Sequence, residues 1–318
     1  MLSVVVPSPG LSPVAAPTRG VMPILPTTFD DQGDLDLESQ MRVVDFAVDA
    51  GVSGVCILAN YSEQFSLSDD ERERLTTAIL EHVAGRVPVI VTTSHFSSRI
   101  AAERSQRAAQ AGASMVMLLP PYHGATLRAT EASLRQFFEQ VAEACPLPVL
   151  VQDAPISGTA LSASFLAALA RDLPSIRWFK IEVPESASKL RELLRLAGEV
   201  IQGPFDGEES ITLLADLDAG ATGTMPSAMV PDLLAPIVDA YLDGRRDDAV
   251  RGYERVLPLI NFENKQCGLR ACKAVFHAGG IITSELVRHP FAPLHPATRA
   301  GLLELAQRLD PLALRWAR

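Results

Sequence analysis

One lysine of this chain occupies an unusual place for a charged residue. Lys180 is the fourth residue of Arg-Trp-Phe-Lys-Ile-Glu-Val-Pro, residues 177–184, a run that otherwise has the composition of a buried β-strand. At the two-residue period of a strand, Trp178, Lys180 and Glu182 point to the same face. Burial of an ammonium group is costly and usually lowers its pKa, and a neutral lysine amine is a nucleophile for carbonyl carbons. The alternative is a lysine near a strand end whose stem is buried and whose head reaches water.

Other polar residues finish other apolar runs of the chain, where they could bind a substrate or move protons. The residues that we consider for these tasks besides Lys180 and Glu182 are Asn60, Tyr61, Ser62, Glu63, Tyr122, His123, Gln152, Asp153 and Asp206. A metal site is not expected, because the six histidines include no His-x-x-x-His pair and the four cysteines have no zinc-like spacing.

The composition excludes several classes of partner. The chain of 318 residues has a formal net charge of −10 and no basic run, which argues against binding to nucleic acid or to anionic membranes. No apolar run approaches the length that crosses a bilayer. Hydrophobic residues make up 47% of the chain, enough for a large core.

The N-terminal residues and the cysteines indicate the compartment. Residues 1–19 contain four prolines and no periodic pattern, so we expect a flexible tail. They also lack the basic start and long apolar centre of a secretory signal. The cysteines are expected to be reduced and mostly buried, which indicates the cytoplasm.

A short apolar run followed by an amphipathic helical pattern occurs eight times. Continuous apolar strands that alternate with helices are typical of a parallel sheet covered by helices. Eight such units over residues 20–242 predict an α/β fold, the (β/α)8 TIM barrel. A doubly wound sheet is the second possibility, but no Gly-x-Gly-x-x-Gly follows the first strand. The apolar runs begin at Val21, Gly54, Val87, Met115, Leu147, Ile176, Val200 and Thr222.

Residues 243–318 show only helical patterns, in three amphipathic segments, so a C-terminal three-helix extension is expected after the barrel.

In a barrel of this type the active site lies at the C-terminal ends of the strands. Lys180 would then lie inside and near the top of the sixth strand, where little water is available to solvate it. This placement favours a nucleophilic role for Lys180.

Several segments, in their order and spacing, resemble the dihydrodipicolinate synthase / N-acetylneuraminate lyase family of class I aldolases and dehydratases. The resemblance runs from about Gly20 to the C-terminus and aligns Lys180 with the Schiff-base lysine of the family. It implies an eightfold barrel with three C-terminal helices, a 2-keto acid substrate, no cofactor other than the covalent lysine imine, and a homotetramer. The segments are Pro-Thr-Thr-Phe-Asp-Asp-Gln-Gly at residues 26–33, Ser-Glu-Gln-Phe-Ser-Leu-Ser-Asp-Asp-Glu-Arg at residues 62–72, Leu-Pro-Pro-Tyr-His at residues 119–123 and Phe-Lys-Ile-Glu at residues 179–182.

Three departures from the family pattern bear on the reaction. The Gly-Thr-Thr-Gly-Glu turn that holds the substrate carboxylate reads Ala-Asn-Tyr-Ser-Glu at residues 59–63. The fourth-strand Tyr-Tyr pair reads Tyr122-His123, and the proton-shuttling tyrosine of the fifth strand falls on Gln152. The chain is more similar to a branch of the family that dehydrates sugar acids, including Val-Gln-Asp-Ala-Pro at residues 151–155 and Gly-Pro-Phe-Asp-Gly-Glu-Glu at residues 203–209. This similarity implies that water is removed from L-2-keto-3-deoxyarabonate to give 2-oxoglutaric semialdehyde, in non-phosphorylating L-arabinose catabolism.

For catalysis the resemblance and the positions of the residues favour Lys180, Glu182 and Tyr122. Glu182 could deprotonate the lysine or could form only a structural ion pair with it. His123 could belong to the site or to a subunit interface. For Asn60 and Ser62, a turn-forming role is the alternative to substrate binding. The residues expected to bind substrate are Asn60, Tyr61, Ser62, Glu63, His123, Gln152, Asp153 and Asp206.

Three functions remain open at this point. A Schiff-base dehydratase of a 2-keto-3-deoxy sugar acid is the first. The second is a retro-aldolase that splits such an acid and releases pyruvate. The third is a non-catalytic binding barrel, which the missing fifth-strand tyrosine suggests and the retained Lys180 opposes.

Overall fold

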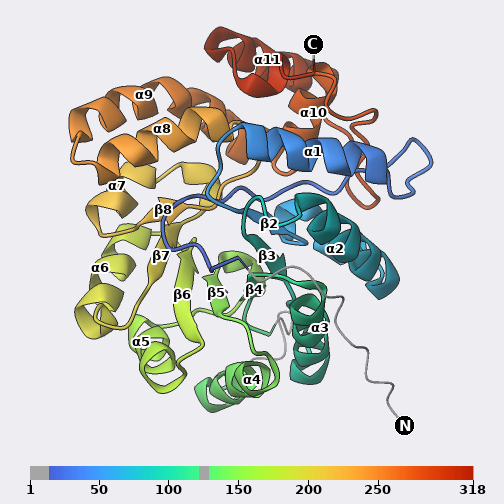
Figure 1. Ribbon diagram of the computed structural model, residues 1–318. Coiled ribbons are helices and arrows are strands. Elements are labelled where there is room, and N and C mark those ends of the chain that lie inside the picture. Colours follow the sequence, from blue (N-terminus) through green and yellow to red (C-terminus); the bar gives the residue numbers. More distant parts are fainter. Residues whose placement is uncertain (1–13, 122–128, 318) are drawn as a thin grey trace.

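Eight parallel strands curl into a barrel with helices around it, as expected from the sequence (Figure 1). The computed structural model describes residues 14–121 and 129–317. Neighbours in the sheet follow the order β1-β8-β7-β6-β5-β4-β3-β2. Parallel bridges from Ile24 to Cys56 and to Ser227 connect the chain after β1 with both of its neighbours and close the barrel. The strands are β1 Gly20–Val21, β2 Val55–Ile57, β3 Val89–Thr92, β4 Met115–Leu118, β5 Val149–Asp153, β6 Ile176–Ile181, β7 Gly203–Asp206 and β8 Gly223–Thr224.

One helix follows each strand on the outside of the barrel, and further helices follow the eighth unit. The outer helices are α1 Leu37–Asp49, α2 Asp69–Val83, α3 Ser98–Ala111, α4 Glu131–Ala144, α5 Ala163–Asp172, α6 Ser186–Ala197, α7 Leu213–Asp218 and α8 Pro231–Leu242. The chain continues through α9 Arg246–Phe262, α10 Arg270–Ala278 and α11 Pro296–Leu309. Figure 1 shows α10 beside α1, and the rings of Phe46 and Phe276 lie 5.0 Å apart at this contact. Helix α11 packs against α10.

Short 3₁₀ segments make up several of the loops that follow the strands: η1 Asn60–Ser62, η2 Gln64–Ser66, η3 Pro155–Ser157 and η4 Glu208–Ser210. In the C-terminal region, the π-helical segment η5 Glu263–Cys267 connects α9 to α10, and the 3₁₀ segment η6 Leu312–Leu314 follows α11. π-Helical turns inside α-helical regions often occur at functional sites.

The interior of the barrel is packed with side chains from alternate strand positions. On β6, Trp178 belongs to the apolar cluster inside the barrel, whereas Phe179 and Ile181 belong to the cluster between the sheet and the helices. The two-residue period therefore directs Lys180 inward, one step above Trp178. Lys180 lies opposite Gln152 of β5 in the register of the sheet, so both side chains are in the same layer near the top of the barrel.

The end of the expected N-terminal tail packs against the bottom of the barrel. Pro17 is buried, and its carbonyl accepts a hydrogen bond of 3.0 Å from Nε1 of Trp178. The carbonyl of Thr18 accepts one of 2.7 Å from the hydroxyl of Thr222. A buried indole N–H needs an acceptor, and this segment supplies it. Pro17 and Thr18, which belong to the expected tail of residues 1–19, thus contact the barrel. Residues 1–13 lie outside the described part.

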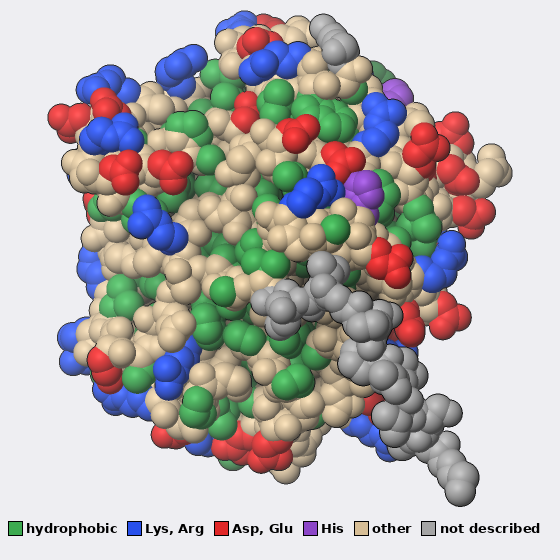
Figure 2. All heavy atoms as spheres, in the orientation of Figure 1, with side chains coloured by type: hydrophobic (Ala, Val, Ile, Leu, Met, Phe, Trp, Pro, Cys, Tyr) green, Lys and Arg blue, Asp and Glu red, His purple; other side chains and the backbone are tan. Residues whose placement is uncertain are grey.

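The surface carries charged side chains of both signs (Figure 2). On the face drawn in Figure 2, positive and negative side chains are mixed, and no field of one sign covers it. In the two described stretches of chain, every helix is too short or too polar to cross a bilayer.

Candidate active site

A cavity of about 220 Å³ lies where the strands end and contains Lys180. It receives side chains from the loop after β2, from β5, from β6, from the loop after β7 and from η5. Its polar lining residues are Asn60, Tyr61, Gln152, Lys180, Glu182, Glu208, Glu209 and Asn264. A closed barrel with one lysine at the bottom of a polar cavity is suited to covalent chemistry on a small carbonyl compound.

Lys180 and Glu182 form an ion pair inside this cavity, and the side chain of Lys180 is only 4% exposed. Burial by itself lowers the pKa of Lys180, but the charge and hydrogen bond of Glu182 more than offset it, so that this pKa is raised. The lowered pKa expected from burial is therefore wrong for this state. The lysine is held as an ammonium ion, and it must give up a proton before it can attack a carbonyl carbon.

Glu182 is held by two further donors. Nε2 of Gln152 donates to its Oε2 at 2.7 Å, and the backbone N–H of Glu208 donates to its Oε1 at 3.4 Å. The carboxylate is thus fixed next to the lysine amine, where it can accept the proton that the amine must lose. This geometry agrees with either of the roles considered for Glu182.

The other end of the Gln152 amide has no hydrogen-bond partner among the described residues. Gln152 is only 2% exposed, and its buried Oε1 accepts no hydrogen bond from the described residues. A carboxylate only accepts, so Nε2 must face Glu182 and Oε1 must be the free end. A buried amide oxygen without a donor is costly, and a ligand with a hydroxyl group would satisfy it.

Glu209 is a second buried carboxyl group at the cavity, and it was not among the expected site residues. Nδ2 of Asn264 donates to its Oε2 at 2.6 Å, and the Tyr61 hydroxyl forms another hydrogen bond with it. Burial, followed by the nearby charge of Glu182, raises the pKa of Glu209 to about 7. Burial also raises the pKa of the Tyr61 phenol, with further contributions from the neighbouring carboxylates.

The backbone that carries Glu209 is strained. Glu208, Glu209 and Ser210 have φ values of 48°, 54° and 67°, in the left-handed region that non-glycine residues rarely adopt. Such residues cost of order 1–3 kcal/mol each and are found mainly at functional sites. The acidic pair after the seventh strand was visible in the sequence. No feature of the sequence pointed to Asn264 as a site residue, because the segment around it shows only a helical pattern.

Two expected substrate-binding residues of the loop after β2 lie outside the cavity. The Ser62 hydroxyl donates to the carbonyl of Leu25 at 2.6 Å. The Glu63 carboxylate pairs with Lys273 of α10 and accepts from the backbone N–H of Arg288 at 2.9 Å. Glu63 has a left-handed φ of 57° between η1 and η2, which turns its side chain away from the barrel axis. Both side chains are engaged by other parts of the chain.

Two expected residues at strand ends also point away from the cavity. Asp153 forms an ion pair with Lys189 of α6. Asp206 accepts from the Thr224 hydroxyl at 2.6 Å, and burial together with the neighbouring Asp216 carboxyl raises its pKa. The reason is the two-residue period: Gln152 and Phe205 point inward, so the next residue on each strand points outward. Tyr122 and His123 lie outside the described residues.

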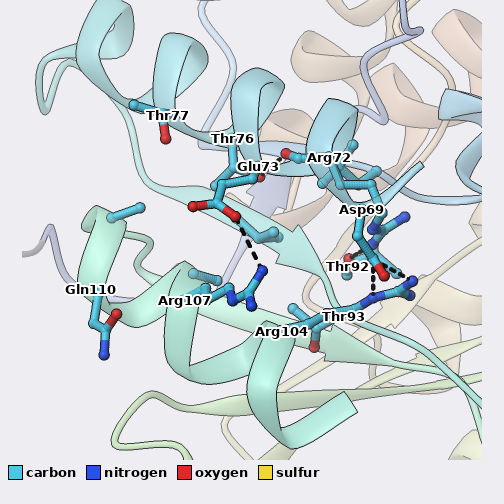
Figure 3. Close-up of a pocket in the computed structure, with 14 residues that line it drawn as sticks. Asp69, Arg72, Glu73, Thr76, Thr77, Thr92, Thr93, Arg104, Arg107 and Gln110 are labelled. Carbon is cyan, nitrogen blue, oxygen red and sulfur yellow. Dashed lines mark hydrogen bonds and ion pairs between the residues drawn. The ribbon is translucent and has the colours of Figure 1, made fainter. Parts of the chain in front are cut away.

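A second cavity, drawn in Figure 3, lies between α2 and α3 on the outer layer. Arg104 pairs there with Asp69 and Arg107 with Glu73, while the buried Arg72 donates to the carbonyl of Thr92 at 2.6 Å. Its charged groups are engaged with one another or with the backbone. This cavity contains neither Lys180 nor Glu209, so it is separate from the candidate active site.

Comparisons with known proteins agree with this geometry. Residues 17–309 match the dihydrodipicolinate synthetase family. An L-2-keto-3-deoxyarabonate dehydratase of Azospirillum brasilense is 60% identical over 299 residues, which cover 94% of this chain and 97% of that protein. A putative 2-dehydro-3-deoxy-D-gluconate aldolase of Escherichia coli is 28% identical, with 93% and 99% of the two chains covered. The crystal structure of a putative dihydrodipicolinate synthetase from Pseudomonas aeruginosa superposes with a TM-score of 0.86 at 28% identity, over 92% of this chain and 99% of that one.

Proposed function

This chain belongs to the dihydrodipicolinate synthetase family, whose enzymes are lyases, and we propose that it dehydrates L-2-keto-3-deoxyarabonate to 2-oxoglutaric semialdehyde. The observation that carries this choice of substrate is the 60% identity, over nearly the whole chain, to a dehydratase of that compound. The lysine at the bottom of a polar cavity supports a mechanism through a covalent imine.

In the proposed mechanism, Lys180 is the nucleophile and Glu182 manages its proton. The ammonium of Lys180 transfers a proton to Glu182, and the free amine attacks C2 of the 2-keto acid. Loss of water from C2 leaves a protonated imine, which withdraws electrons and makes the C3 hydrogens acidic. Since the imine is the electron sink, the proposal requires no metal or other cofactor.

The later steps rearrange the carbon chain. Removal of a C3 proton gives an enamine, and departure of the C4 hydroxyl as water gives a conjugated imine. Loss of a C5 proton then forms an enol. Protonation at C4 with loss of the enol O–H proton gives the aldehyde at C5, and protonation at C3 restores the protonated imine. Hydrolysis of the imine releases the product and regenerates Lys180. The reaction needs a proton donor at the C4 oxygen and must avoid cleavage between C3 and C4.

Gln152 supports elimination over cleavage. Retro-aldol cleavage requires a base to take the proton of the C4 hydroxyl, and an amide cannot act as that base at neutral pH. The free Oε1 of Gln152 instead offers an acceptor for a substrate hydroxyl. The aldolase alternative rests on the Escherichia coli relative, at 28% identity. A non-catalytic barrel would not need a buried Lys180–Glu182 pair, whose desolvation is costly.

The proposal is tested by the products formed from L-2-keto-3-deoxyarabonate. The dehydratase makes 2-oxoglutaric semialdehyde, an aldolase makes pyruvate and glycolaldehyde, and a binding protein leaves the compound unchanged. Semialdehyde and pyruvate can be measured in one reaction with separate coupled dehydrogenases. Pyruvate as the main product would replace this proposal with the aldolase alternative.

Replacement of Gln152 by tyrosine is expected to raise the fraction of pyruvate among the products. A phenol at this position could accept the C4 hydroxyl proton and so permit cleavage, even if crowding lowers total turnover. Gln152→Phe is the control, because it fills the same space without a hydroxyl and should not form additional pyruvate. Equal product ratios for Gln152→Tyr and the wild type would show that this position does not choose the reaction.

The proposal extends to the setting of the enzyme. We place it in the cytoplasm and in the non-phosphorylating breakdown of L-arabinose, as a homotetramer whose barrel carries the C-terminal extension of residues 243–318. The free, buried cysteines support a reducing compartment: Cys56, Cys145, Cys267 and Cys272. Large hydrophobic side chains are exposed beside the mouth of the cavity, among them Phe65, Ile156 and Phe291, and they support association with other copies of the chain.

A further inference from the structure

We propose that Glu209 is the general acid that protonates the departing C4 hydroxyl group. This inference rests on the proposed dehydration and assigns the proton donor that the reaction requires at the C4 oxygen. Gln152 cannot exchange a proton, and Glu182 is engaged with the amine of Lys180.

The position of Glu209 is suited to this task. It lines the same cavity as Lys180 and Gln152, yet the residue is only 5% exposed. It comes from the loop after β7, while Lys180 lies on the neighbouring strand β6. A substrate joined to Lys180 through C2 extends its C4 and C5 atoms into the rest of this cavity, of which Glu209 forms a wall.

The surroundings of Glu209 raise its pKa and fix the orientation of its carboxyl group. The ionisable groups that act on it are the carboxyl groups of Glu182 and Glu263, the ammonium of Lys180 and the phenol of Tyr61. The two carboxyl groups disfavour a further negative charge, as does burial. Tyr61 and Asn264 hold the carboxyl group from two sides. A pKa of about 7 is close to the optimum for a general acid near neutral pH.

The strained loop provides a second, independent observation. Three successive non-glycine residues, Glu208 to Ser210, adopt left-handed φ values. The strain is retained where surrounding contacts enforce it, and here the enforced conformation directs Glu209 toward Asn264 across 55 residues of sequence. A turn that only connected β7 to α7 would not need this conformation.

Glu209 supplies the proton with which the C4 hydroxyl group leaves as water. The electron pair of the enamine forms the C3=C4 bond, and the C4–O bond breaks with its electrons moving to oxygen. That oxygen takes the proton of Glu209 and leaves as water. Glu209 remains as a carboxylate and is reprotonated from solvent before the next turnover.

The test is Glu209→Gln, which keeps the size of the side chain and one acceptor oxygen but has no acidic proton. Dehydration of L-2-keto-3-deoxyarabonate should fall by about 100-fold or more in kcat, the usual contribution of a general acid. Borohydride should still trap the substrate on Lys180. In D₂O the variant should return unreacted substrate with deuterium at C3, because C3 deprotonation comes before the blocked step.

The pH dependence gives a further readout. The acid must be protonated, so the kcat of the wild type should fall as the pH rises through the Glu209 pKa of about 7. The Glu209→Gln variant should lack this decline, while Lys180, Glu182, Tyr61 and Glu263 remain in both proteins. A merely structural role would lower the rate equally at every pH.

Glu285→Gln is the matched control. Glu285 forms a partly exposed ion pair with Arg299 and does not line the cavity. We expect its kcat to stay within a few-fold of the wild type. The proposal for Glu209 fails if Glu209→Gln dehydrates within about threefold of the wild type, or if it loses imine trapping and C3 exchange together with turnover. Absence of dehydration by the wild type would instead refute the proposed function.

Discussion

Lys180→Ala is expected to show no trappable imine and a loss of turnover of more than about 10⁴-fold, as when other enzymes lose a covalent nucleophile. The reason is chemical: without the amine no imine forms, and the C3 hydrogens of a free 2-keto acid are far less acidic. The measurement is borohydride reduction in the presence of substrate, followed by mass spectrometry of the peptide that carries Lys180. The wild type should gain the mass of the reduced ligand on that peptide.

Lys189→Arg is a suitable control for this experiment, because arginine keeps a positive charge beside the buried Asp153 carboxylate but cannot form an imine. Lys189 is also largely buried near the top of the barrel, but it pairs with the outward-facing Asp153 and does not line the cavity. It should keep the label on Lys180 and much of the turnover. If Lys180→Ala retained a tenth of the wild-type activity, the imine mechanism would be wrong, and thermal melting would show whether the variant is folded.

The second large effect concerns stability and involves Lys273→Met. Lys273 and Glu63 are 1% and 0% exposed in their side chains and form an ion pair between α10 and the loop after β2. Lys273 also donates to the carbonyl of Leu286 at 2.7 Å and lies 4.4 Å from the ring centre of Phe29. Removal of one partner leaves a buried carboxylate without its counter-charge. We expect the free energy of unfolding to fall by about 3–5 kcal/mol.

Urea unfolding followed by circular dichroism measures this change. The double variant Lys273→Met, Glu63→Gln should recover part of the loss, because no unpaired charge then remains. The control is Lys265→Met, since the Lys265–Glu208 pair is 52% and 37% exposed and should contribute less than about 1 kcal/mol. Equal losses for Lys273→Met and Lys265→Met would show that the buried pair does not stabilise the contact with α10.

The strands of the barrel were predictable because each is buried on both faces. A parallel strand covered by helices on one side and by the barrel core on the other is apolar throughout, so its composition marks it. The boundaries were less certain: the seventh apolar run begins at Val200, but β7 begins at Gly203. The N-terminal residues were harder still. The contact of Pro17 with Trp178 is a single hydrogen bond across 161 residues, and it leaves no periodic pattern in the chain.

For the candidate site, the alternation of side chains along a strand predicts some residues and excludes others. The period of two on β6 placed Lys180 inside the barrel, with Glu182 two residues further on. On β5 and β7 it excludes Asp153 and Asp206, because Gln152 and Phe205 occupy the inward positions. A strict use of this alternation could have removed both aspartates beforehand. It could not have removed Glu63, whose direction depends on a left-handed residue between two short helices.

The sequence by itself therefore determined the barrel, the buried lysine and the carboxylate two residues after it, since these depend on periodicity within one segment. Only the tertiary structure decided that Asn264 of η5 and Tyr61 of η1 meet Glu209 of η4. It also decided that Lys180 is charged at rest, because the pKa depends on the balance between burial and the distance to Glu182. Contacts between loops of different units, and the electrostatic field that they produce, are set by how the whole chain closes around the barrel and not by the spacing of residues along it.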